Sequence, residues 1–242
     1  IGFVITGKTY INSIAYAGSS DKADYRISYT NLYQGSIAPN MSLKRNTLEF
    51  NTGYKIMPKL EIRSSMSYIN TNSPNRTGTG GRGDQNLMYS FLTQGRQSDL
   101  NRLKNYWVEG YEGLEQWGDN FRVMNNPYFS VYQITHSENK NRLFGNFTLN
   151  YQFTPFLSLM ARTGTDLYFT KTEDKIAYSA IGNPLGGYGQ DDILFNERNS
   201  DFLLTYDKKI SNDWTFNISA GGSQMYQNIS TSSITASQLN IP

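Results

Sequence analysis

Aromatic and amide side chains gather in one stretch near the middle of the chain, and their chemistry is that of binding. Flat rings pack against the C–H faces of sugars or against apolar side chains, while amides hydrogen-bond hydroxyl and peptide groups. The residues predicted to contact a ligand are Tyr106, Trp107, Tyr111, Trp117, Asn126 and Tyr128. Asn120 and Asn125 lie among them and add polar partners. The alternative is that these rings form a small core of their own segment, or the seat of a partner protein.

Catalytic chemistry has little support in the sequence. His136 is the only histidine, and Ser137 follows it directly. Neighbouring residues of a strand point to opposite faces, so these two side chains do not form a base and nucleophile pair. We therefore predict no catalytic residue and no enzyme activity.

Glycine-rich and acidic strings do not have the context of cofactor or metal sites. The strings at 80–84 and 186–189 lack the strand-to-helix setting of a phosphate-binding loop and are predicted to be flexible loop tips. Asp191 and Asp192 supply too few oxygen ligands for calcium. The chain has no cysteine, which excludes disulfides and thiolate metal sites. Its net charge of +2 gives no reason to expect nucleic acid. We predict no cofactor, no metal and no nucleic-acid partner.

A two-residue alternation of side-chain character sets the elements that position these residues. From Tyr25 to Tyr33 the odd positions are mostly large and apolar, and the even positions are mostly polar. A strand sends alternate side chains to opposite faces, so such a segment has one apolar and one polar face. The alternation predicts eight strands, at about 8–17, 23–34, 44–55, 60–69, 142–153, 157–168, 200–209 and 214–222.

The predicted connections alternate between short and long. Short turns are expected at 18–22, 57–59, 154–156 and 211–213, and longer connections at 35–43, 70–141, 169–198 and in the tail from 223. Outer-membrane barrels have short periplasmic turns, long extracellular loops, an apolar outer face and a polar lumen. The predicted fold is an all-β, transmembrane antiparallel β-barrel with extracellular loops at about 70–141 and 169–198. A soluble all-β protein is the alternative, but it has no reason to keep its long loops at one end. The predicted lumen-lining residues are Arg26, Glu49, Glu61, Arg63 and Arg162.

Several segments resemble the barrel of SusC/RagA-type TonB-dependent transporters. In the first half they are Tyr25-Arg26-Ile27-Ser28-Tyr29 with Gly35, Arg45-Asn46-Thr47-Leu48, Leu87-Met88-Tyr89-Ser90-Phe91-Leu92, Leu103-Lys104-Asn105-Tyr106-Trp107 and Gly110-Tyr111-Glu112-Gly113. In the second half they are Arg142-Leu143-Phe144-Gly145-Asn146, Phe153-Thr154-Pro155-Phe156-Leu157-Ser158-Leu159 and Asp201-Phe202-Leu203-Leu204-Thr205-Tyr206. Asn126-Pro127-Tyr128-Phe129 matches the family's Asn-Pro-Tyr-Trp pattern with Phe in place of Trp. The likeness spans most of the chain from about Tyr10 to Gly222.

The resemblance implies a barrel of ~22 strands in the outer membrane of a Gram-negative, Bacteroidetes-type bacterium, of which this chain is a fragment of about eight strands. It implies a plug domain outside this chain, a SusD-like surface lipoprotein as lid, contact with the TonB complex, and import of oligosaccharides or peptides. Outer-membrane lipid is the expected surrounding of the apolar face. Two alternatives remain: a complete eight-stranded barrel acting as structural anchor or adhesin, and an outer-membrane hydrolase that uses His136.

Overall fold

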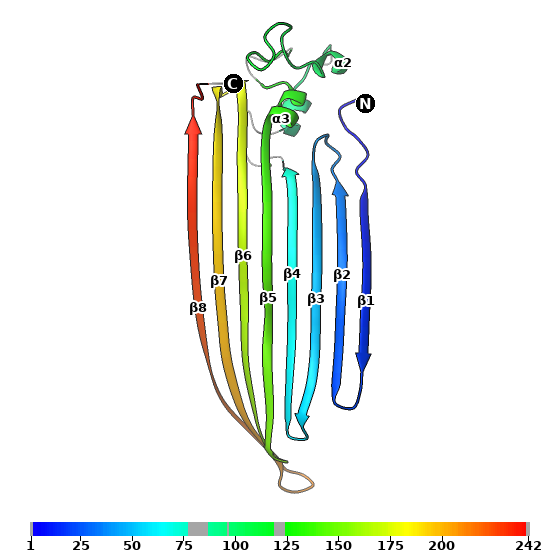
Figure 1. The fold of residues 1–242 in the computed structure, drawn as a ribbon, viewed down its shortest axis with the longest axis vertical. Helices are drawn as coiled ribbons and strands as arrows, with labels where there is room; N and C mark the ends of the chain where they lie inside the picture. The colour runs from blue at the N-terminus through cyan, green and yellow to red at the C-terminus, as the bar shows by residue number, and fades with distance from the viewer. Residues whose placement is uncertain (1, 77–86, 96, 119–123, 241–242) are drawn as a thin grey trace.

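The computed structural model describes residues 2–76, 87–95, 97–118 and 124–240, which form a single antiparallel sheet and three short helices (Figure 1). The predictions made for Asn120 and for the string at 80–84 lie outside these residues. The strands are β1 (Thr9–Ser19), β2 (Ala23–Gly35), β3 (Ser42–Met57), β4 (Leu60–Asn75), β5 (Ile134–Thr154), β6 (Leu157–Ala180), β7 (Asn183–Lys209) and β8 (Thr215–Ser237). The helices are α1 (Leu87–Leu92), α2 (Leu100–Leu103) and α3 (Pro127–Gln133). Among the described residues, no helix has the length and apolar character needed to cross a membrane.

Alternation of apolar and polar residues sets the register between strands, as the sequence predicts. Ile27 lies opposite Phe50, and Phe50 lies opposite Met66, so apolar side chains line up across β2, β3 and β4. On the reverse face the Ser28 hydroxyl donates to the Glu49 carboxylate at 3.1 Å. All eight predicted strands and all four predicted short turns are confirmed, and each strand pairs with its neighbour in sequence.

The predicted long loop at 169–198 is wrong. The structure has two long strands there, β6 with 24 residues and β7 with 27, joined by a tight turn at Ile181 and Gly182. Polar residues occupy both faces of this extension, for example where Lys171 lies opposite Asp192. Backbone hydrogen bonds hold such a ladder without an apolar face, so alternation of hydropathy does not reveal it. For the same reason the predicted tail from 223 is strand as far as Ser237, and the loop predicted at 70–141 is shorter, between Asn75 and Ile134.

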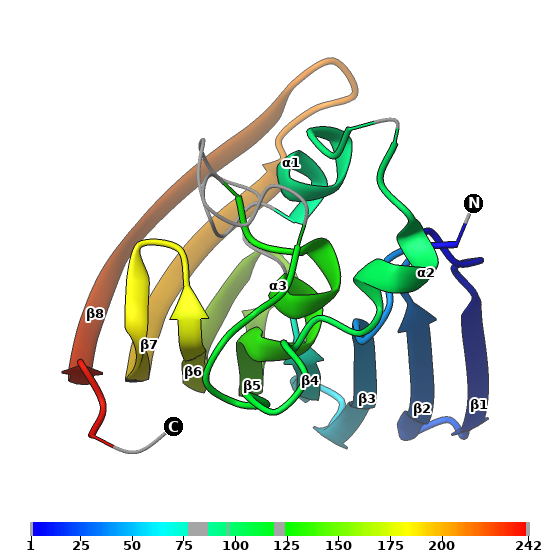
Figure 2. The same cartoon turned by 90° about the horizontal axis from the view of Figure 1, so that it is seen from above.

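The sheet is a curved wall, and its concave side carries the three helices (Figure 2). Ser130 of α3 lines the same cavity as His136 of β5 and Asp174 of β6, which identifies the face of the strands that looks toward the helices. Strand register places Arg162 of β6 on this concave face together with Asp174. The same register places all five residues predicted to line the lumen on the concave face, namely Arg26, Glu49, Glu61, Arg63 and Arg162.

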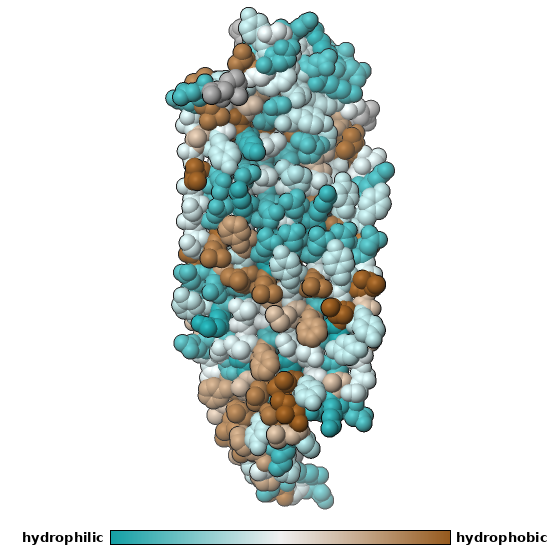
Figure 3. Space-filling model, in the orientation of Figure 1, coloured by the Kyte–Doolittle hydropathy of each residue, from teal (hydrophilic) through white to brown (hydrophobic). Residues whose placement is uncertain are grey.

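The opposite, convex face exposes large apolar side chains. They include Ile27, Leu48, Phe50, Met66, Phe147, Phe202 and Leu204. Figure 3 shows apolar surface gathered over the lower half of the molecule, with polar surface above it. A face this apolar is unusual for a protein surrounded by water, and it is the pattern of a barrel wall in lipid.

The sheet is open. Strand order runs from β1 to β8, and within the described residues β1 pairs with β2 alone and β8 with β7 alone. A complete eight-stranded barrel requires β1 to pair with β8, so that alternative is wrong for this structure. Unpaired edges of this length are normally covered by further strands.

Candidate ligand-binding loop and lumen wall

The segment between β4 and β5, called here the long loop, packs around an apolar core above the sheet, to which Phe3 from the chain before β1 also contributes. Phe3, Leu87, Leu103, Tyr128 and Val131 are buried together in it. The backbone carbonyl of Val131 accepts hydrogen bonds from the side chains of Asn40 at 2.9 Å and Asn75 at 3.0 Å. These bonds fasten α3 to the connection between β2 and β3 and to the end of β4.

Asn126 organises the long loop. Its side-chain oxygen accepts from the backbone N–H of Tyr128 at 2.8 Å, and Pro127 occupies the first helical position, so α3 begins with a favourable cap. Its side-chain nitrogen donates to the carbonyl oxygens of Leu103 at 2.9 Å and Trp117 at 2.7 Å. Asn126 is 1% exposed, so its amide holds three segments of the loop together.

A second group of buried amides ties the long loop to the turn between β6 and β7. The Gln116 side chain donates to Asn125 at 2.7 Å, and Asn125 accepts from the backbone N–H of Ile181 at 2.9 Å. Gln116 also bonds Ser179, whose φ of 71° gives it a left-handed backbone. The β6–β7 extension, which the sequence did not reveal, therefore holds the part of the loop around Gln116 and Asn125.

Tyr106, Trp107 and Trp117 come together around one hollow of about 640 Å³, called here the loop hollow. The Arg102 guanidinium lies 4.1 Å from the centre of the Trp117 ring. The remaining lining residues are Lys104, Asn105, Val108, Glu109 and Glu112. Half-buried rings with charges of both signs around them can hold a ligand that has flat or apolar surfaces and polar edges.

The other three predicted contact residues lie elsewhere. Tyr111 is 57% exposed and is not part of the loop hollow. Tyr128 is 5% exposed, its hydroxyl donates to the carbonyl oxygen of Gly2 at 2.9 Å, and its ring packs edge-on against Phe3. Asn126 and Tyr128 thus form the loop's core here, which is the alternative that the sequence left open. The Asn126-Pro127 pair is typical of the start of a helix, so the sequence contained a signal that Asn126 has a structural role.

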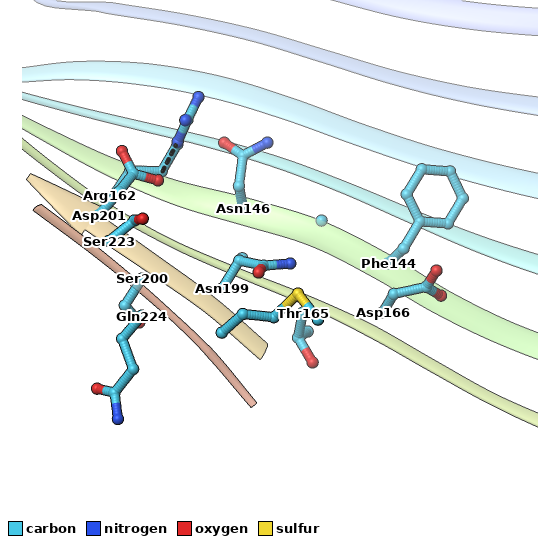
Figure 4. A pocket seen from close by; sticks show the side chains of 13 residues that line it. Phe144, Asn146, Arg162, Thr165, Asp166, Asn199, Ser200, Asp201, Ser223 and Gln224 are labelled. Carbon is cyan, nitrogen blue, oxygen red and sulfur yellow. Dashed lines mark hydrogen bonds and ion pairs between the residues drawn. The ribbon is translucent and has the colours of Figure 1, made fainter. Parts of the chain in front are cut away.

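Ion pairs line the concave face, which is the lumen wall of the proposed barrel. Arg162 bonds Asp201 at 3.0 Å, and Arg142 makes a two-pronged pair with Asp166 at 2.8 and 2.5 Å. Figure 4 shows Arg162 and Asp201 pointing toward each other beside a hollow of about 530 Å³. Arg142, Asp166 and Asp201 were not predicted as lumen residues; that they share the face of Arg162 follows only from the register between strands.

His136 makes a close pair with Asp174, with 2.6 Å between Nδ1 of the ring and Oδ1 of the carboxylate. Ser137 lies on the opposite face, as expected from its neighbouring position. Ser130 lines the same cavity, but its hydroxyl makes no hydrogen bond to the histidine. The pair therefore has no hydrogen-bonded serine nucleophile among the described residues.

No protein-family model matches the sequence, and no curated protein sequence matches it. Solved structures do match. The structure of the RagAB peptide transporter matches with a TM-score of 0.76 and 18% identity over 98% of this chain and 26% of that chain. The RagAB peptide importer in its open-open state matches with a TM-score of 0.71 and 20% identity over 95% of this chain and 25% of that one.

A third solved structure is BauA, the ferric preacinetobactin receptor from Acinetobacter baumannii, with a TM-score of 0.52 and 11% identity over 95% of this chain and 31% of that chain. At these identities the likeness establishes the fold. The chain has the fold of part of the barrel in these transport and receptor proteins, and the resemblance to the SusC/RagA type is confirmed at the level of the fold. The chain spans about a quarter of the length of the RagAB chains that it matches.

Proposed function

We propose that this chain is part of the barrel of an outer-membrane, TonB-dependent nutrient importer of the SusC/RagA type. The observation that carries the proposal is an open sheet with an apolar convex face and an ion-paired concave face. Eight strands alone close around a lumen just wide enough to be filled by side chains. Charged pairs such as Arg142 with Asp166 are suited instead to a wider lumen that holds water or a plug.

A row of hydrogen-bonded side chains supports a membrane boundary on the convex face. Asn31, Asn46, Asn70 and Asn141 lie opposite one another across β2, β3, β4 and β5. The hydroxyl of Tyr29 donates to Asn46, and that of Tyr68 donates to Asn141, each at 2.8 Å. Tyrosine favours the boundary between hydrocarbon and water, where its ring is buried and its hydroxyl is wet.

The proposed mechanism is capture followed by passage, with no bond made or broken in the cargo. The loop hollow lies above the lumen wall and contacts the cargo, while a SusD-like surface lipoprotein closes over it. The plug domain and the TonB-contacting segment supply the energy coupling. Both the lid and these parts are expected from the family resemblance.

Oligosaccharides and peptides are the proposed cargo classes. The aromatic rings and charged rim of the loop hollow suit either class. Two of the similar structures are titled as a peptide transporter and a peptide importer, which supports peptides as the first class to test.

The test is deletion of the gene in its host and measurement of uptake. Isotope-labelled peptide and oligosaccharide pools are supplied separately to the parent strain, the deletion strain, and the deletion strain that carries the full-length gene. Uptake of one pool should fall on deletion, return with the gene, and be lost again when TonB is removed. Uptake that is unchanged by deletion, or that persists without TonB, would overturn the proposal.

A further inference from the structure

A hollow of about 300 Å³ opens on the convex face, where β4, β5 and β6 run side by side. We call it the convex groove. Met66 of β4 and Leu143 and Phe147 of β5 give it apolar walls. Gly145 lies between Leu143 and Phe147 on the same face of β5, and because it has no side chain, the face stays open there. The convex-face side chains that complete its lining are Ser64, Thr163, Thr165 and Arg198.

Strand register places a guanidinium at one end of the convex groove. Met66 is opposite Gly145, Gly145 is opposite Thr165, and Thr165 is opposite Arg198, so these residues form one row across β4 to β7. Along β7, Arg198 lies between Leu194 and Phe202, two exposed apolar residues of the same face. A permanent positive charge is therefore set within the apolar convex face.

The barrel wall does not balance the charge of Arg198. On the convex face of β6, β7 and β8, all three of which the structure describes in full, the carboxylates belong to Asp192 and Glu173. Asp192 is six residues from Arg198, which is about 20 Å along the strand. The side chains next to Arg198 on this face are all uncharged, namely Asn196, Ser200, Thr165 and Tyr226.

Aromatic rings mark the end of the apolar face that is farther from the long loop. Phe156 and Tyr206 lie 5.4 Å apart, and Tyr206 and Phe216 lie 6.1 Å apart, beside the short turns at the foot of the sheet (Figure 1). Outer-membrane barrels carry such aromatic girdles at the two edges of an apolar band that is about 25 Å tall. These rings therefore place the periplasmic edge of the band.

The position of Arg198 relative to this girdle puts it in the outer half of the membrane. It is eight residues above Tyr206 on the same face of β7, which is about 27 Å along the strand and, at a tilt of about 35–45°, roughly 20 Å in height. A long, flexible arginine side chain can extend from there to the outer boundary of the band. That boundary, on the side of the long loop, is where the headgroups of the outer leaflet lie.

We propose that the convex groove binds a phosphate-bearing lipid of the outer leaflet, with an acyl chain over Gly145 and the headgroup phosphate on Arg198. The apolar walls bury the chain, and the forked donors of a guanidinium match the oxygens of a phosphate. An uncharged lipid would leave Arg198 without a counter-charge. The proposal rests on the outer-membrane function proposed above and adds a specific lipid to it.

Native mass spectrometry tests this site on the full-length transporter with its surface lipoprotein. The complex is stripped of lipid in detergent and titrated with lipid A that carries two phosphates, or with the same lipid after removal of both phosphates. We expect the phosphorylated form to bind about tenfold more tightly. Arg198→Gln should remove that preference. Arg198→Lys should keep part of it, because the charge remains and the forked geometry is lost.

A change that fills the convex groove separates the acyl chain from the phosphate. Thr165→Phe places a ring between Gly145 and Arg198 without a change in charge, and it should weaken binding of both lipids. Thr163→Phe, from the opposite wall of the groove, repeats the test if Thr165→Phe does not assemble. Arg26→Gln, on the concave face, is the matched control and should bind both lipids as the parent does.

Three results would overturn the lipid site. They are equal binding of the two lipids by the parent protein, an unchanged preference in Arg198→Gln, and unchanged lipid binding in the assembled groove-filling variant. If Arg198→Gln alters the oligomeric state and leaves lipid binding unchanged, the face belongs to a neighbouring protein and the proposal is likewise wrong. None of these outcomes contradicts import, which the deletion experiment tests separately.

Discussion

Gln116 and Ser179 are joined by two hydrogen bonds although 63 residues separate them in the chain. The backbone N–H of Gln116 donates to the Ser179 hydroxyl at 2.9 Å, and the Gln116 side chain donates to the Ser179 carbonyl oxygen at 2.5 Å. The long loop is thereby carried by the extended β6–β7 hairpin. Because these contacts are made by buried amides, they fix the part of the loop around Gln116 and Asn125 against the hairpin.

Asn126→Ala should loosen the long loop while the barrel stays folded. The substitution removes a helix cap, worth about 1 kcal/mol, and two buried hydrogen bonds of about 1 kcal/mol each. We expect the free energy of local opening to fall by roughly 3 kcal/mol, as measured by hydrogen exchange at the amides of 100–118 and 124–133. Asn105→Ala, at an exposed asparagine of the same loop, is the matched control. Equal protection in Asn126→Ala and the parent would contradict the role assigned to this amide.

The strands with an apolar convex face were predictable from sequence because their side chains alternate in chemical character. Phe147 and Thr148 differ in character since one lies on the convex face and the other on the concave face. The upper halves of β6 and β7 have no such contrast, so their residues looked like a loop. There the strands are held by backbone hydrogen bonds, which do not depend on side-chain hydropathy, so the hydropathy pattern does not predict them.

The sequence predicted which segment holds the candidate ligand-binding residues, but it did not predict how those residues are arranged. Clustered rings marked the segment that contains Trp107 and Trp117, yet which ring is buried depends on the capping and amide contacts of Asn126. His136 and Asp174 lie opposite each other in the parts of β5 and β6 that the sequence analysis placed in long loops, so their pairing was not predicted. Pairing between residues so far apart in the chain cannot be inferred from the residues next to each of them.

Phe147→Arg should impair assembly of the full-length barrel far more than Thr148→Arg. The first places a guanidinium on the lipid face, at a cost of about 2–4 kcal/mol near the bilayer centre, and the second places it on the polar face. The measurement is the fraction of heat-modifiable, folded barrel in isolated outer membranes. Equal assembly of the two variants would show that the convex face does not meet lipid.

Trp107→Ala and Trp117→Ala should weaken cargo binding about tenfold each without unfolding the loop. Each change removes a ring face of the loop hollow, and loss of Trp117 also removes the surface on which Arg102 rests. Affinity is measured by calorimetry with the cargo that the uptake experiment identifies. Leu114→Ala, an exposed apolar residue of the same loop outside the hollow, should bind as the parent does. If all three variants bind alike, the hollow is not a cargo site.

Alkaline pH should open the long loop through Tyr128. Burial raises the pKa of Tyr128 above the ordinary value of about 10, with a smaller contribution from Tyr132. The unfolded loop releases this proton at lower pH than the folded loop does, so the stabilisation is complete below about pH 10 and is lost as pH rises through the raised pKa. Limited proteolysis with an alkaline-active protease should therefore cut the loop faster as pH rises from about 9 to 11. Tyr128→Phe, which cannot ionise, should flatten that dependence, whereas Tyr111→Phe at an exposed position should retain it. A parent-like pH dependence in Tyr128→Phe would assign the opening to another group, because the phenylalanine keeps the packing against Phe3 and removes only the ionisable hydroxyl.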